Sequence, residues 1–122
     1  MVLVDTSVWI RFLANRAPVA GQLDELLRQG EVCGHDFVFG ELLIGDKGGR
    51  KQFLADYALM HQAAVVPHRE VVEFVRQRRL HGRGIGWIDT HLLASALVSH
   101  IKLWTADPRL GEVARELRLD YE

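Results

Sequence analysis

The chain has 122 residues, of which 48% are hydrophobic and 25% are charged, the composition of one ordinary globular domain. We therefore expect a single domain over residues 1–122. A formal charge of -1 excludes a polycation that binds nucleic acid through bulk charge. The single cysteine, Cys33, excludes an internal disulfide, and the sequence shows neither a long apolar run nor a basic leader. We expect a cytoplasmic location and no membrane partner.

Short apolar runs alternate with helical patterns along the chain. We expect strands at residues 1–5, 31–35, 63–67, 101–105 and 119–121, and helices between them at 6–15, 21–29, 37–44, 52–60, 69–80, 88–99 and 108–117. Thr6 or Ser7, Asp36 and Asp107 are the expected helix N-caps. Strands that alternate with helices indicate an α/β fold with a parallel sheet.

Four acidic residues fall where this order of elements predicts the carboxyl edge of the sheet. They are Asp5 at the end of the first strand, Glu41 in the helix after the second, Asp89 at the start of the helix before the fourth, and Asp107 one loop after the fourth strand. Open α/β sheets bind ligands beyond the carboxyl ends of their strands. We therefore expect the four carboxylates to converge in space.

Asp89 is the most informative of the four. Leu92 and Leu93 follow three and four residues later, so the carboxylate shares the core face of its helix. Asp5 poses a similar question, since it ends a strand predicted to be central and has no lysine or arginine nearby in sequence. An unpaired charge in an apolar setting costs several kcal/mol, whereas a cation shared by several carboxylates compensates it.

Carboxylate oxygens without nitrogen or sulfur ligands suit Mg²⁺ or Mn²⁺ better than zinc. Such an ion lowers the pKa of water and neutralises charge on a phosphoryl group, so a phosphodiester is the natural substrate of this site. Thr6, Ser7 and Thr105 lie beside the acids in sequence. We expect these hydroxyls to orient a carboxylate or a water by hydrogen bonds.

Each acid also has a simpler explanation. Asp5 could belong to an ordinary strand-to-helix turn, Asp107 could be only a helix cap, and Asp89 could be only an acid favoured by the helix dipole. Glu41 could form a surface ion pair with Lys47. The joint placement of all four at one sheet edge favours a site over these separate explanations.

Four segments of the chain carry a resemblance to a known family. They are LVDTSVWIRFL at 3–13, FGELLIG at 39–45, GWIDTHLLASAL at 86–97 and LWTADPRL at 103–110. In order and spacing they resemble the four acidic motifs of the PIN-domain family, in particular its VapC-type ribonuclease toxins of toxin–antitoxin pairs. The resemblance runs along the whole chain.

The resemblance implies a five-stranded parallel sheet between helices, in three layers. It also implies a Mg²⁺- or Mn²⁺-dependent endoribonuclease, a cognate VapB-like antitoxin and a homodimer. It places the catalytic acids on Asp5, Glu41, Asp89 and Asp107, with Asp5, Asp89 and Asp107 as metal ligands and Glu41 as either a further ligand or a general base. Many PIN domains carry another acid after the fourth motif, where this chain has Pro108 and Arg109, which weakens the case for a second metal ion.

A basic strip offers a surface for RNA despite the net charge. Five arginines lie between the third expected strand and Asp89, namely Arg69, Arg76, Arg78, Arg79 and Arg83. We expect Arg76, Arg79 and Arg83 to be possible RNA contacts, although a solvated helix face explains the strip equally well. Trp87 could stack on a base, but a core or dimer contact is the more usual role of such a residue.

Other functions fit the residues less well. A receiver domain needs paired acids after the first strand and a late lysine, and an aspartyl phosphatase needs Asp-x-Asp, where residue 7 is serine. A catalytically inactive PIN-like module that only binds RNA or protein remains the alternative, because the sequence alone does not show that the carboxylates converge.

Overall fold

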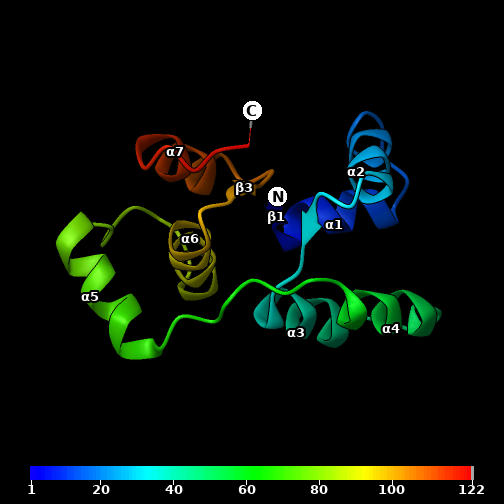
Figure 1. Cartoon of the computed structure of the whole chain (residues 1–122), viewed down its shortest axis with the longest axis horizontal. Coiled ribbons are helices and arrows are strands. Elements are labelled where there is room, and N and C mark those ends of the chain that lie inside the picture. The colour runs from blue at the N-terminus through cyan, green and yellow to red at the C-terminus, as the bar shows by residue number, and fades with distance from the viewer. Residues whose placement is uncertain (122) are drawn as a thin grey trace.

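A computed structural model describes residues 1–121, in which seven helices surround a small sheet (Figure 1). The strands are β1 (Val2–Val4), β2 (Val32–Cys33) and β3 (Lys102–Trp104). The helices are α1 (Thr6–Leu13), α2 (Val19–Arg28), α3 (Asp36–Ile44), α4 (Lys51–Leu59), α5 (His68–Arg78), α6 (Trp87–Ser99) and α7 (Pro108–Glu116).

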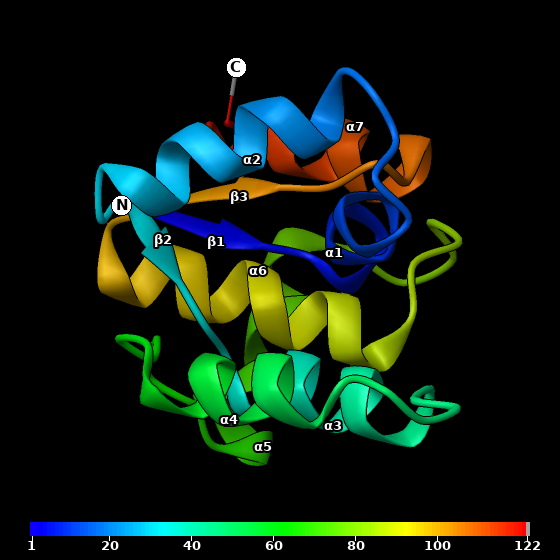
Figure 2. The ribbon, with the colours of Figure 1, turned by 90° about the vertical axis from the view of Figure 1, so that its right-hand side faces the viewer.

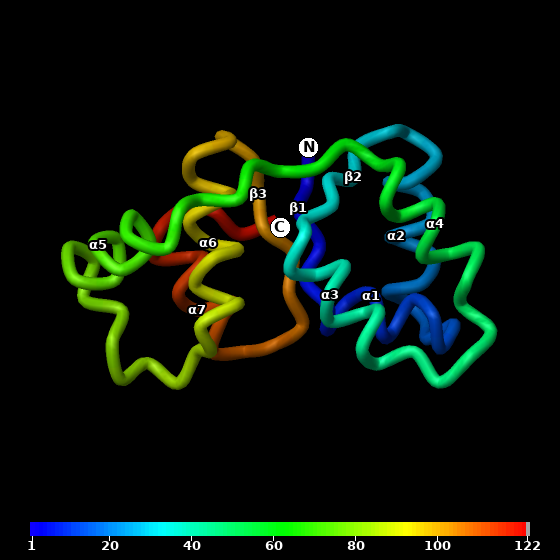
Figure 3. The backbone as a smooth tube through the Cα atoms, turned by 90° about the horizontal axis from the view of Figure 1, so that it is seen from below, coloured from blue at the N-terminus to red at the C-terminus, as the bar shows by residue number. Residues whose placement is uncertain are grey.

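The three strands form a parallel sheet in the order β2-β1-β3. Leu3 pairs with Cys33 on one side and with Leu103 on the other. In Figure 2, α1 and α2 lie on the side of the sheet that faces the viewer, with α6 and α7 behind the sheet, and Figure 3 shows the same two pairs of helices on opposite sides. Because both faces are covered, Leu3 and Val4 are completely buried, which explains why β1 is a continuous apolar run rather than an alternating one. The expected α/β fold with a parallel sheet is confirmed.

The expected number of five strands is wrong for this structure. The two outer positions of the sheet are reduced to isolated parallel bridges, Gly34 with Gln62 and Leu103 with Asp120. The segments predicted as strands at 63–67 and 119–121 therefore touch the sheet without extending it.

The chain leaves the sheet too early for a fourth strand to form. Only two backbone hydrogen bonds join Gly34 to its neighbour, one to the carbonyl of His61 and one from the amide of Ala63. At the next residue, His35, the chain turns into α3. Residues 63–67 then have no strand to pair with, and this segment crosses from α4 to α5 as irregular chain (Figure 3).

Two expected helix caps are wrong and one is confirmed. Asp5, not Thr6 or Ser7, occupies the N-cap position of α1 and makes no side-chain cap. His35, not Asp36, caps α3, since its Nδ1 accepts a hydrogen bond of 3.0 Å from the amide of Phe37. Asp107 caps α7 as expected, with Pro108 at the first helical position.

The core holds the elements that carry the acids in fixed positions. The middle of α6, residues 90–96, is buried, with Leu92, Leu93 and Ala96 at zero exposure. Trp9 of α1 packs edge-on against Tyr57 of α4, with ring centroids 5.5 Å apart. Among residues 1–121, no helix is both long and apolar enough to cross a membrane.

Candidate active site

Asp5 lies at the carboxyl end of the central strand and is 5% exposed. Its Oδ2 accepts two short hydrogen bonds, from Ser7 Oγ and from Thr105 Oγ1, both 2.7 Å long. The backbone amide of Asp5 donates to the carbonyl of Trp104, which keeps β1 and β3 in register up to this residue. The carboxylate is thus held by neutral donors and keeps its negative charge uncompensated.

The same two hydroxyls connect the first and fourth acidic segments. Ser7 Oγ accepts a hydrogen bond of 3.0 Å from the amide of Ala106, and Thr105 Oγ1 accepts one of 3.0 Å from the amide of Asp107. The two hydroxyl oxygens lie 3.3 Å apart. This network fixes the loop between β3 and α7 against the start of α1, although the two segments are about a hundred residues apart in sequence.

Glu41 reaches the site from α3. Its Oε1 accepts a hydrogen bond of 2.6 Å from Thr6 Oγ1, directly beside Asp5. Glu41 is half-buried and forms no ion pair with Lys47, so the alternative of a surface ion pair is wrong. The helix after the second strand therefore points this acid at the edge where the first strand ends.

The pKa of Asp89 is affected by the other three acids. Burial raises the pKa of this carboxyl, and the hydrogen bond of 3.2 Å from the amide of Gly86 opposes the rise. The charges of Asp5, Asp107 and Glu41 act in the same direction on this pKa, so Asp89 lies within electrostatic range of the other three acids. Like charges gathered at a half-buried site leave an excess of negative charge that a cation would relieve.

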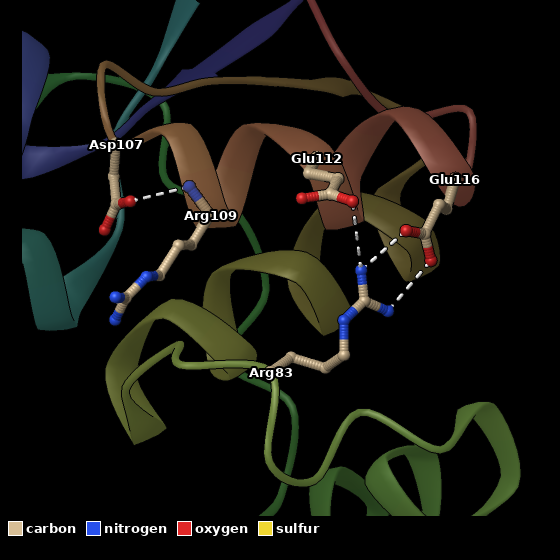
Figure 4. Close-up of polar contacts among 5 residues, drawn as sticks. All are labelled: Arg83, Asp107, Arg109, Glu112 and Glu116. Atoms are coloured by element: carbon tan, nitrogen blue, oxygen red, sulfur yellow. Dashed lines mark hydrogen bonds and ion pairs between the residues drawn. The ribbon is translucent and has the colours of Figure 1, made fainter.

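Asp107 stands at the start of α7. Its Oδ1 accepts a hydrogen bond of 2.9 Å from the amide of Arg109, so this oxygen serves as the helix cap (Figure 4). Asp107 is half-buried, and its own amide is fixed by Thr105. The residue therefore combines the structural role of a cap with a place among the four acids.

The four carboxylates are the type of ligand that a divalent cation prefers, but their positions in the structure do not form a complete metal site. None of the four carboxylates forms an ion pair with a lysine or arginine of residues 1–121, so their charge is free for an ion. In the same part of the chain, no three acidic, histidine or cysteine side chains are arranged to hold a metal. Each of the four acids has one oxygen that accepts a hydrogen bond from a neighbouring hydroxyl or backbone amide.

The arginines predicted as RNA contacts differ in their surroundings. Arg76 and Arg79 are exposed at the carboxyl end of α5, the end that leads toward Asp89. Arg83 instead donates two hydrogen bonds to the carboxylate of Glu116, 2.9 and 2.6 Å long, and approaches Glu112 (Figure 4). Arg83 thus ties the loop at 79–86 to α7.

The sequence pattern did not identify an apolar groove next to Glu41. It has a volume of about 640 Å³ and runs between α3 and the start of α6. Its lining includes Phe37, Ile44, Val65, Trp87 and His91. The sequence does contain a sign of this groove, because the apolar residues Ile44 and Trp87 lie outside the core stripes of their helices. In the structure these two side chains are 89% and 41% exposed.

The acidic side chains near the carboxyl edge of the parallel sheet lie where open α/β folds bind their ligands. The PIN domain family model matches residues 2–116, and the chain belongs to this family. The resemblance that the sequence motifs carried is therefore confirmed.

A curated relative shows where in the family the chain lies, and two solved structures share its fold. It is 46% identical to Ribonuclease VapC32 of Mycobacterium tuberculosis, in strains CDC 1551 / Oshkosh and H37Rv, over 95% of this chain and 92% of the relative. The fold is also similar to that of PAE2754 from Pyrobaculum aerophilum, with a TM-score of 0.58 and 18% identity over 91% of this chain and 82% of the other. The structure of FitAB bound to an IR36 DNA fragment contains a chain with a TM-score of 0.62 and 21% identity, over 94% of this chain and 91% of that one. At these identities the two structures support the fold alone.

Proposed function

We propose that this protein is an endoribonuclease of the VapC type, the toxin of a toxin–antitoxin pair, and that it hydrolyses RNA phosphodiester bonds with a divalent cation. The observation that supports the proposal is the arrangement of hydroxyls and acids at the sheet edge, where Asp5 accepts from Ser7 and Thr105 and Glu41 accepts from Thr6. Neither acid forms an ion pair with a lysine or arginine of residues 1–121. The relationship to Ribonuclease VapC32 over nearly the whole chain supports the same activity.

Asp5, Asp89 and Asp107 are the residues that would hold Mg²⁺ or Mn²⁺. A cation bound there would offset the negative charge of the phosphate and lower the pKa of water. Glu41 either completes the ligand set or accepts the proton of the attacking water. The water oxygen bonds to phosphorus in line with the bond to the 3′ oxygen, which breaks, so the products carry a 5′ phosphate and a 3′ hydroxyl.

Ser7 and Thr105 act on this chemistry through Asp5. Two hydroxyl donors on one oxygen of Asp5 fix the orientation of the carboxylate. Thr6 does the same for Glu41. None of these hydroxyls needs to touch the RNA, so we assign them as positioning residues.

The activity is tested by incubating the purified protein with total RNA in Mg²⁺, in Mn²⁺ or in EDTA, and then mapping new 5′ ends. The proposal predicts discrete ends with either cation and none in EDTA. Cleavage that persists in EDTA would contradict the metal-dependent mechanism. Absence of cleavage with both cations, in protein shown to be folded, would favour the alternative of an inactive RNA- or protein-binding module.

The partners follow from the same assignment. We propose a VapB-like antitoxin that covers a groove of about 370 Å³ between α1 and the loop after α3, lined in part by Ile10, Leu13 and Arg50 and reaching Glu41.

We further propose a homodimer that buries the groove of Ile44 and Trp87, since exposed apolar side chains gathered in one groove are typical of protein interfaces. A cytoplasmic location agrees with an RNA substrate.

A further inference from the structure

Arg109 is the cationic side chain that the fold places next to Asp107. It lies in the first turn of α7, where its amide donates to Asp107 Oδ1 at 2.9 Å. The side chain is exposed. Figure 4 shows its guanidinium on the side where Asp107 lies, pointing away from Glu112 and Glu116.

Gly84 provides a bare backbone surface for this side chain. A Cβ added at Gly84 would lie 2.9 Å from both Cδ and Nη1 of Arg109, and 3.3 Å from its Cζ. Gly84 also has a φ of +80°, which side-chain-bearing residues rarely adopt. Only two residues further along, Gly86 donates its amide to Asp89. The loop therefore receives the Arg109 guanidinium between the third and fourth acidic segments.

Arg83 and Arg109 lie close to the same loop but differ in their charge partners. Arg83 is neutralised by a bidentate pair with Glu116. Arg109 forms no ion pair with any carboxylate of residues 1–121, even though Asp107 is its near neighbour. Its planar fork of N–H donors is therefore free for an anion, and such a fork matches a phosphate in a bidentate arrangement.

We propose that Arg109 binds a phosphate group of the RNA strand at the edge formed by the four acids. This inference rests on the proposed function, since it names the group that holds the substrate there. Four carboxylates repel a phosphodiester, and a guanidinium lying against Gly84, in the loop that leads to Asp89, supplies a directed attraction. The arrangement leaves Arg83 with the structural task of holding the loop in place.

RNA binding measured apart from cleavage tests this proposal. In the Asp5→Asn background, the affinity for a fluorescein-labelled single-stranded RNA oligonucleotide is measured by anisotropy at several salt concentrations. We expect Arg109→Ala to weaken binding by about tenfold and to reduce the slope of log K against log salt by about 0.7. Arg109→Lys should restore the slope but only part of the affinity. Arg115→Ala, which removes an exposed arginine from the same helix, is the matched control and should change neither quantity.

Two results would overturn the proposal. The first is an Arg109→Ala variant with the affinity and salt slope of its parent. The second is a variant whose Tm falls while its salt slope stays the same, because Arg109 would then only pack the loop. A wild-type protein that binds RNA but cuts none would refute the proposed function, while the binding comparison would still decide the role of Arg109.

Discussion

Asp5 is the most buried acid of residues 1–121. It is buried at the end of the central strand, and the only groups that the structure places on its Oδ2 are two hydroxyls. Hydroxyl donors stabilise a carboxylate, but they do not cancel its charge as an arginine would. The structure thus surrounds Asp5 with neutral donors and pairs it with no lysine or arginine of residues 1–121, a setting that a bound cation would complete.

Replacing Thr105 tests the positioning role. Thr105→Val keeps the shape of the side chain but removes the hydrogen bond to Asp5 and the acceptor for the amide of Asp107. We expect RNA cleavage to fall by about 10–100-fold. Thr105→Ser keeps the hydroxyl and should retain most of the activity. Initial cleavage rates and Tm values of the two variants test this role. Full activity in a folded Thr105→Val protein would contradict a positioning role for Thr105.

The places of three acids in the fold could be predicted from the sequence, since Asp5 and Asp107 follow apolar strands and Asp89 shares a face with Leu92. Their partners could not. The hydrogen bond between Thr105 and Asp5 joins residues a hundred positions apart, so only the pairing of β1 with β3 brings them together. The ion pair of Arg83 with Glu116 was hidden for the same reason.

At the scale of elements, His35 connects three of them. Its amide donates to the hydroxyl of Tyr57 in α4, its Nδ1 caps α3, and its Nε2 lies 2.9 Å from Ser95 Oγ in α6. A backbone amide can only donate, so Nδ1 carries no proton and Nε2–H donates to Ser95. The sequence favoured Asp36 as the cap because a short carboxylate is the commoner choice. The buried imidazole takes that place because its second nitrogen also reaches α6.

This arrangement predicts a loss of stability in acid. Burial lowers the pKa of His35 to about 4, with Asp36 opposing and His91 adding to the effect. In the unfolded chain the imidazole has a pKa near 6.5, so between pH 6.5 and 4 it binds a proton that it does not bind in the folded protein. Stability from this residue is present above about pH 6.5 and is lost as the pH falls toward 4, by about 2 kcal/mol between pH 7.5 and 5.

Urea unfolding at pH 7.5 and pH 5.0 measures the effect. His35→Asn keeps a capping oxygen but cannot titrate, so its free energy of unfolding should be lower at pH 7.5 and should change less between the two values. The same pH dependence in wild type and variant would assign the acid sensitivity to other groups.

At the scale of the whole molecule, the three-stranded sheet is small because its strands are short: β2 ends at Cys33 and β3 ends at Trp104. The order of strands and helices could be predicted from apolar runs and breaks in the sequence. The strand count could not, because it depends on where a neighbouring chain segment turns away, as at His35. Helices therefore carry the four acids, since Glu41 lies in α3, Asp89 lies in α6, and Asp5 and Asp107 occupy the N-cap positions of α1 and α7.

The homodimer is tested by a charge placed in the groove beside α3. Ile44→Glu should convert a dimer of twice 13.8 kDa into a monomer, because burying a carboxylate in an apolar interface is costly. Leu59→Glu is the matched control, since Leu59 is similarly exposed at 85% but lies on α4, outside the groove. Size-exclusion chromatography with light scattering gives the masses. A wild-type monomer, or a dimer unaffected by Ile44→Glu, would refute this interface.

One comparison tests most directly whether the acids at the sheet edge, of which Asp5 is buried, carry out RNA cleavage. Cleavage of a mapped RNA site in Mg²⁺ is measured for wild type, Asp5→Asn and Asp56→Asn, an exposed acid of α4 that serves as control. The account predicts a loss of more than about a hundredfold for Asp5→Asn, with its Tm near that of wild type and Asp56→Asn fully active. Full cleavage by a folded Asp5→Asn protein would contradict it.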